Sequence, residues 1–187
     1  MIVTQQYCQT VSHTNRILET RKRPDIVIRS AADSDASGIT DIYNHYVSKT
    51  AFTFEEDEVT DAEMVRRINE VQTAQLPWLV ATRNNSISGY AYATKWRSRP
   101  AYRFSVEVTV YVDPGSERLG IGSRLYEELL SELRASGIHA VIGGITLPNE
   151  ASVALHERLG FSKVAHFKDV GFKFNRWIDV GYWQRNL

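Results

Sequence analysis

One carboxylate and two glycines, close together in the chain, are the residues of this sequence whose types and spacing suggest chemistry. Glu107 stands inside the valine-rich segment 106–112, and Gly120 and Gly122 follow where a helix-forming segment begins. Backbone N–H groups in a glycine-rich turn and at a helix N-terminus bind phosphate groups. A phosphate-binding loop beside an unusual carboxylate indicates a group-transfer enzyme that uses a phosphorylated carrier.

The position of Glu107 between valines suggests a role in proton transfer. Desolvation by apolar neighbours raises the pKa of a carboxyl group, and a carboxylate with a raised pKa can act as a general base toward an amine. The alternative is an ordinary strand glutamate that faces solvent or an ion-pair partner, because alternation points Glu107 away from the side of Val106 and Val108. The residues alone leave both readings open.

Other phosphate-binding and metal-binding patterns do not fit the chain. A dinucleotide fingerprint requires a third glycine where Leu125 stands, and the loop that binds nucleoside triphosphates requires a Gly-Lys-Ser/Thr sequence that the chain lacks. The five histidines are scattered and form no His-Glu-x-x-His pattern, so no metal is predicted.

Composition narrows the range of partners. The chain has 22 Lys and Arg and 22 Asp and Glu, so its formal net charge is zero, whereas nucleic acids and anionic membranes attract basic proteins. Neither is predicted as a partner, and no apolar run approaches the ~20 residues that span a bilayer. Cys8 is the only cysteine, which excludes an internal disulfide and favours a cytoplasmic location.

The length predicts one domain behind a polar segment. A chain of 187 residues with 43% hydrophobic residues can build a single core without disulfides or metals. Residues 1–24 are polar, carry the basic cluster 21–23 and lack the apolar region of a secretory signal. We therefore expect a flexible N-terminal extension at 1–24 and a domain at 25–187.

Hydrophobic periodicity predicts a mixed α/β domain. Helices are expected to begin near Asp33 and Thr60, as their caps, and at residues 121–133 and 149–159. Strands are expected at 26–28, 78–81, 87–93, 102–112, 140–145, 163–166 and 177–184, with 167–176 as a loop or hairpin. This order predicts a mixed sheet with helices on both faces.

Two segments carry a resemblance to a known superfamily. Residues 106–122 resemble motif A of the GNAT N-acetyltransferases, a strand followed by the pyrophosphate loop (Gln/Arg)-x-x-Gly-x-(Gly/Ala). Gly120 and Gly122 match that pattern, whereas Glu117 departs from its first position and Arg118 follows one place later. Residues 149–161 resemble motif B, in which an Asn precedes a Tyr by seven residues; His156 stands where that Tyr would be.

Over residues 25–187, the chain resembles a smaller group of enzymes within this superfamily. The segments 96–97, 106–112, 147–149 and 171–184 are similar to phosphinothricin and methionine sulfoximine N-acetyltransferases. The resemblance implies the GNAT fold, with a V-shaped splay between two central strands for acetyl-CoA. It also implies acetyl transfer from acetyl-CoA to the primary amine of a small amino-acid-like substrate, no metal and a homodimer.

Site residues follow from the same resemblance. Glu107 and His156 fall on the positions assigned to chemistry, with His156 as an acid or a second base. The residues implied to bind acetyl-CoA are Val108, Val110, Tyr111, Val112, Arg118, Leu119, Gly120, Ile121, Gly122, Ser123, Asn149 and Arg158. The expected substrate contacts are Phe54, Trp96, Arg97 and Arg103.

Each of these residues has a structural alternative. His156 can be a satisfied core histidine, and Asn149 can simply cap its helix. A guanidinium fork suits a carboxylate or phosphinate, but Arg97 and Arg103 can equally form surface ion pairs. Two other functions also stay open: acetylation of a protein or peptide N-terminus, and a CoA-binding module without catalysis, which the departure at Glu117 would favour.

Overall fold

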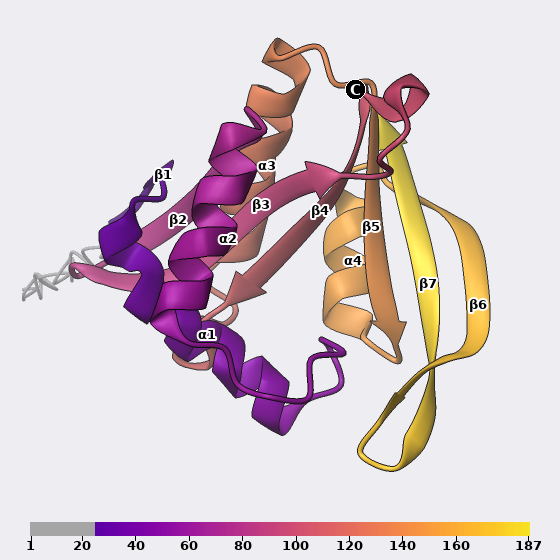
Figure 1. The fold of residues 1–187 in the computed structure, drawn as a ribbon, viewed down its shortest axis with the longest axis horizontal. Helices are drawn as coiled ribbons and strands as arrows, with labels where there is room; N and C mark the ends of the chain where they lie inside the picture. Colours follow the sequence, from indigo (N-terminus) through magenta and orange to yellow (C-terminus); the bar gives the residue numbers. More distant parts are fainter. Residues whose placement is uncertain (1–24) are drawn as a thin grey trace, which may run out of the picture.

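The computed structural model describes residues 25–187 (Figure 1). The expected extension at 1–24, with its basic cluster and Cys8, lies outside the described residues. Within residues 25–187, no helix is long and apolar enough to cross a membrane. The same residues contain no group of three or more His, Cys, Asp and Glu side chains placed to hold a metal ion.

Residues 25–187 form one seven-stranded sheet in the order β1-β2-β3-β4-β5-β7-β6. Its strands are β1 (Ile26–Ser30), β2 (Trp78–Arg83), β3 (Ser86–Lys95), β4 (Ser105–Val112), β5 (Ala140–Leu147), β6 (Ser162–Lys173) and β7 (Arg176–Asn186). The helices are α1 (Ala36–Lys49), α2 (Asp61–Thr73), α3 (Ile121–Ala135) and α4 (Glu150–Arg158). Only β4 and β5 pair in parallel, so the expected mixed sheet is confirmed.

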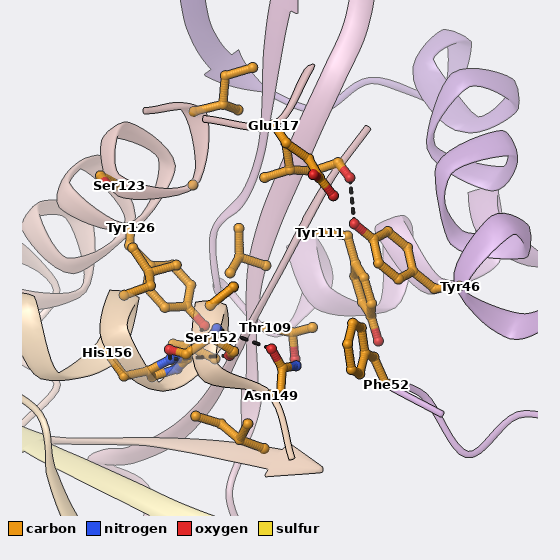
Figure 2. A pocket seen from close by; sticks show the side chains of 18 of the residues that line it. Tyr46, Phe52, Thr109, Tyr111, Glu117, Ser123, Tyr126, Asn149, Ser152 and His156 are labelled. Carbon is orange, nitrogen blue, oxygen red and sulfur yellow. Dashed lines mark hydrogen bonds between the residues drawn. The ribbon is translucent and has the colours of Figure 1, made fainter. Parts of the chain in front are cut away.

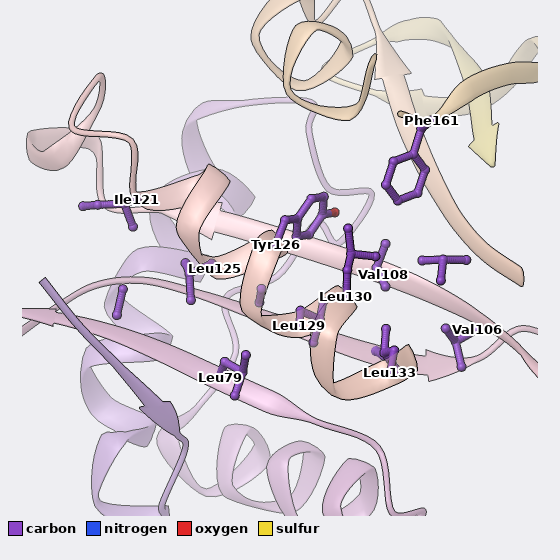
Figure 3. Packing of buried hydrophobic residues seen from close by; sticks show 14 of the residues in the cluster. Leu79, Val106, Val108, Ile121, Leu125, Tyr126, Leu129, Leu130, Leu133 and Phe161 are labelled. Atoms are coloured by element: carbon purple, nitrogen blue, oxygen red, sulfur yellow. The ribbon is translucent and has the colours of Figure 1, made fainter. Parts of the chain in front are cut away.

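Helices cover both faces of this sheet. On one face, α1 and α2 bury Ile39 and Ile68 against Trp78. On the other face, α3 buries Leu129 against Leu79, as Figure 3 shows. Successive strand residues point to opposite faces, so the neighbours Trp78 and Leu79 enter different cores.

The sheet divides between β4 and β5. These two strands pair only from Ser105↔Ala140 to Glu107↔Ile142, although each runs five residues further. β5 stays paired with β7 from Ala140 to Leu147, so β5, β7 and β6 diverge from β4 together. Figure 1 shows β4 and β5 diverging from a common start, which confirms the expected V-shaped splay.

Two local expectations were wrong, and a third was right in one of its two forms. The strand expected from residue 102 begins at Ser105, because Pro100–Tyr102 form a 3-10 turn. Of the loop or hairpin expected at 167–176, the hairpin is confirmed: β6 continues to Lys173 and β7 begins at Arg176. The loop is wrong, and a register shift between Phe167 and Gly171 interrupts the alternation that would have revealed the strand. Asp33 does not cap α1. The nearby Asp35 carboxylate instead accepts the Ala32 N–H at 2.9 Å.

Candidate active site

A cavity of about 630 Å³ occupies the splay between β4 and β5. Figure 2 shows its lining side chains converging from both strands, from the start of α3 and from α4. Tyr46 at the end of α1 and Phe52 in the following loop line the side opposite α4. The cavity is therefore built where the sheet stops being continuous.

Backbone groups of β4 are directed into this cavity. The Asp113 N–H donates to the Ser88 carbonyl and the Trp96 N–H donates to the Ser105 carbonyl. Hydrogen-bonded positions in an antiparallel pair alternate, so the odd-numbered residues of β4 bond to β3. The peptide groups of the even-numbered residues face β5, and beyond the last β5 pair they border the cavity. These groups are the carbonyl of Val108, whose N–H still faces the Ile142 carbonyl, and the peptide groups of Val110 and Val112.

Tyr46 was missed by the sequence analysis and fixes the far end of β4. Its hydroxyl donates to the Val112 carbonyl at 2.6 Å, and its ring lies 5.0 Å from that of Tyr111, centre to centre. The bond joins residues 66 positions apart, and no local pattern predicts it. It holds α1 against the open edge of β4.

The glycine loop ends in an uncapped helix N-terminus. Gly120 adopts the left-handed φ of +78°, and the first turn of α3 has neither a side-chain cap nor an acidic residue. Among the described residues, no side chain therefore caps its first N–H groups. From α4, Arg158 donates to the Ser123 hydroxyl at this turn. An uncapped N-terminus beside a guanidinium fits a diphosphate, although Glu117 and Arg118 both line the same cavity.

The remaining predicted acetyl-CoA residues lie around this loop and cavity with different exposures. Ile121 has its side chain in the core, and Leu119 lies exposed on the loop. Asn149 lines the cavity and also caps α4, accepting the Ser152 N–H at 3.1 Å. Capping and a free face toward the cavity are thus compatible for Asn149.

Glu107 lies at the apex of the splay, in the last residue pair that joins β4 to β5. Its side chain is half-buried, and burial raises the pKa of its carboxyl group. The positive charge of Arg97 opposes that rise. A Cβ added at Gly144 would lie 3.0 Å from Oε1 of Glu107 and 3.2 Å from the ring of Tyr182. Gly144 therefore lets this carboxylate lie close to the backbone of β5, at a residue that is itself exposed and lines the cavity.

His156 lies on the other side of β5. A Cβ at Gly143 would lie 2.5 Å from its Nε2, whereas the next residue, Gly144, faces Glu107. The His156 side chain is 3% exposed, and burial lowers its pKa. Because Nδ1 lies 2.8 Å from the Ser152 carbonyl, it carries the proton, and Nε2 is left to accept from the Tyr126 hydroxyl at 3.3 Å.

The four predicted substrate residues do not form one cluster. The Arg97 guanidinium stacks 4.9 Å from the centre of the Trp96 ring, and that ring meets Tyr182 edge-on at 5.7 Å. Arg103 lies over Phe104 on the turn before β4. Phe54 comes from the α1–α2 connection and packs against Gly171 of β6.

Several residues at the site had only weak signals in the sequence. The pair Gly143-Gly144 inside a predicted strand could have indicated close approach of other groups. Tyr126 lies on the buried side of a predicted helix, where the sequence pattern predicts only a core residue. Tyr182 reads as an ordinary strand residue, and only the pairing of β5 with β7 brings it beside Gly144.

Comparison with known proteins identifies the family. The model of the acetyltransferase (GNAT) domain matches residues 28–181. The chain belongs to the GNAT acetyltransferase family. A phosphinothricin N-acetyltransferase of Streptomyces viridochromogenes is 39% identical over 166 residues, covering 89% of this chain and 90% of that protein. The L-methionine sulfoximine/L-methionine sulfone acetyltransferase of Salmonella typhimurium is 37% identical, covering 87% and 95%.

Solved GNAT structures agree with the fold and the co-substrate. A phosphinothricin acetyltransferase from Sinorhizobium meliloti, crystallised in complex with acetyl-CoA, matches with a TM-score of 0.84 at 37% identity. The match covers 87% of this chain and 88% of that one. The chain is therefore an acetyl-CoA-dependent N-acetyltransferase. Acetyl-CoA supplies an activated acetyl thioester, and the uncapped α3 N-terminus with the free β4 peptide groups fits its diphosphate and amide-bearing arm.

The two adjacent glycines of β5 predict mutational effects on stability that differ in size. Gly143→Ala forces a methyl group into the buried His156 ring and should reduce the free energy of unfolding by about 1–3 kcal/mol. Gly144→Ala meets side chains at the open cavity, which can shift, and should change it by less than about 1 kcal/mol. Urea unfolding of both variants measures the difference. Equal destabilisation would contradict the two-sided arrangement.

Proposed function

We propose that this enzyme acetylates the primary amine of a small amino-acid-like substrate, such as phosphinothricin or methionine sulfoximine. The observation that carries the proposal is Glu107: a half-buried carboxyl group with a raised pKa, close to Gly144, which is exposed and lines the cavity. The names of the relatives from Streptomyces viridochromogenes and Salmonella typhimurium support the substrate class.

Glu107 is proposed as the general base. An amine arrives as an ammonium ion and cannot attack a thioester until it loses a proton. A carboxylate whose pKa is raised by burial accepts that proton, directly or through water, more readily than an ordinary glutamate. In this proposal the amine nitrogen approaches Oε1 from the cavity that Gly144 lines. The attack then places negative charge on the thioester oxygen, and the cavity-facing N–H of Val110 is the proposed donor to it.

His156 is proposed to act as a proton acceptor rather than as an acid. A neutral imidazole with a lowered pKa holds no spare proton near neutral pH. Its Nε2 accepts from the Tyr126 hydroxyl, and both residues line the cavity. Between the two roles left open by the sequence, the hydrogen bonds of His156 therefore favour the second base.

Arg97 is the proposed partner of the acidic group of the substrate. Its guanidinium is exposed and acts on the same carboxyl group that would deprotonate the amine. Phe54 and Trp96 are proposed as apolar walls. Arg103 is exposed on a turn, so we propose that it contributes at the rim of the pocket, by attraction over a longer distance.

We propose that the enzyme is a homodimer formed through the β6–β7 hairpin. β6 is an edge strand, and exposed apolar side chains gather on the hairpin: Val164, Phe167, Val170, Phe172, Phe174 and Trp177. An edge with such a surface usually has a covering partner. Sedimentation velocity should show a dimer that Trp177→Glu dissociates; a monomeric parent protein would contradict this.

A cytoplasmic location completes the proposal. The single cysteine of the sequence supports it, because proteins of oxidising compartments more often carry disulfides. Recovery of the expressed chain in a secreted or membrane fraction would contradict it.

Glu107→Gln should lower kcat/KM by about 10²- to 10⁴-fold, the usual contribution of a general base. In the parent enzyme, kcat/KM should fall as the pH falls through the pKa of Glu107, since the protonated carboxyl accepts nothing. Because burial raises this pKa, that decline begins at a higher pH than for an exposed glutamate. A pH–rate profile measures both effects, with Glu128→Gln on α3 as the control. An unchanged acidic limb in Glu107→Gln would contradict the role.

Arg97→Gln should raise the KM for phosphinothricin by about 10- to 100-fold, since a charge-assisted hydrogen bond contributes ~1.5–3 kcal/mol. The matched control is an analogue of phosphinothricin that keeps the amine and lacks the acidic groups. The parent enzyme and Arg97→Gln should acetylate this analogue at the same rate. Thiol release from acetyl-CoA, measured with amino acids, polyamines and short peptides, provides the comparison. Turnover of peptides alone would favour the N-terminal acetyltransferase, and CoA binding without turnover would favour the binding module.

A further inference from the structure

Lys173, near the end of β6, is a buried amine that the proposed chemistry does not use. Its side chain is 3% exposed. Its Nζ donates to the Val47 carbonyl at 2.7 Å and to the Thr53 carbonyl at 2.9 Å. A lysine is seldom buried without a structural reason, because desolvating its charge is costly. The side chain joins the C-terminal hairpin to a part of the chain about 120 residues earlier.

The carbonyl groups that Lys173 binds belong to the end of α1 and to residues 50–54, which we call the wall segment. The Val47 carbonyl is in the last turn of α1, where the helix dipole favours a cation. Phe52 of the wall segment lines the cavity. Phe54 packs on Gly171, two residues before Lys173, so closely that a Cβ there would overlap its ring. Hairpin and wall segment therefore meet through one hydrogen-bonded cation and one aromatic contact.

The wall segment lies on the same face of the sheet as Glu107. The Thr53 hydroxyl is 2.9 Å from the Tyr43 hydroxyl, and the Tyr43 ring packs edge-on against Tyr111 at 5.4 Å. Tyr111 is four residues after Glu107, so strand alternation directs both side chains to one face. The uncapped turn of α3 and the buried His156 are on the other face. The wall segment thus borders the side from which an amine reaches Glu107.

We propose that Lys173 is a positioning residue for the amine substrate, which fastens the wall segment to the β6–β7 hairpin. The Nζ acts through the two backbone carbonyls and does not touch the substrate. The proposal rests on the proposed function only for its kinetic consequence; the fastening itself is a property of the fold. Because Lys173 is on β6, the hairpin that is proposed to form the dimer also supports the substrate pocket.

Limited proteolysis tests the fastening without any substrate. Residues 55–58 read Glu-Glu-Asp-Glu, so a glutamate-specific protease reports opening of the chain directly after the wall segment. Lys173→Met, which keeps the length of the side chain and removes its donors, should speed cleavage there by about tenfold, since local opening sets the rate. Lys168→Met, an exposed lysine on the same strand, is the control and should cleave like the parent protein.

Steady-state kinetics tests the positioning. Lys173→Met should raise the KM for the amine by about tenfold and leave the KM for acetyl-CoA within about twofold, because the two substrates use different faces. Lys173→Arg, which restores a donor cation, should recover part of the loss. Equal increases in both KM values, or parent-like values with parent-like cleavage, would overturn the proposal.

Gly171→Ala is a second variant that tests the same contact. Loss of acetyl-CoA binding would indicate that Lys173→Met does not fold. In that case Gly171→Ala is used instead, because it displaces Phe54 of the wall segment and leaves the Lys173 amine in place. It should reproduce the faster cleavage and the higher amine KM, and an unchanged Gly171→Ala would overturn the proposal. If the parent enzyme acetylates none of the amines tested, the proposed function fails, and the cleavage rates still decide the role of Lys173.

Discussion

The early end of the pairing between β4 and β5 is the constraint on which the rest of the structure depends. Three residue pairs join these strands, the last at Glu107 and Ile142. Beyond them, no strand within residues 25–187 pairs with β4 on that side. A buried peptide group without a partner costs about 1–3 kcal/mol, so an extended ligand that carries amides is favoured there. The cavity, the position of Glu107 and the co-substrate all follow from this interruption.

The surrounding elements keep the strands apart. β4 is bonded to β3 and β5 to β7, so each strand belongs to a different half of the sheet. Tyr46 bonds the last cavity-facing carbonyl of β4, while α4 packs against β5 on the other side. Gly143 and Gly144 let the imidazole and the carboxylate approach β5 from opposite faces. The backbone of β5 thus separates the surroundings of His156 from those of Glu107.

Much of this arrangement is readable in the sequence because it depends on local rules. The valine run, the glycine loop and the helix periods predict the β4–α3 unit, and the resemblance to GNAT enzymes supplies the splay. Contacts between distant segments are not predictable in this way: Lys173 and Val47 are 126 residues apart. The bulge near Gly171 hides the period of β6. Asp35 rather than Asp33 directly precedes α1, and its carboxylate binds Arg29 on β1 at 2.6 Å, a contact that the local pattern does not show.

Amide hydrogen exchange along β4, measured by NMR with and without acetyl-CoA, is the most direct test of the claim that the unpaired edge of β4 binds the co-substrate. The N–H groups of Thr109 and Tyr111 bond to β3 and should exchange at the same rate in both samples. The N–H of Val108 faces the Ile142 carbonyl in the last strand pair and serves as a second reference. The cavity-facing N–H of Val110 should exchange at least about tenfold more slowly once acetyl-CoA is bound. An unchanged rate at Val110 would contradict the claim.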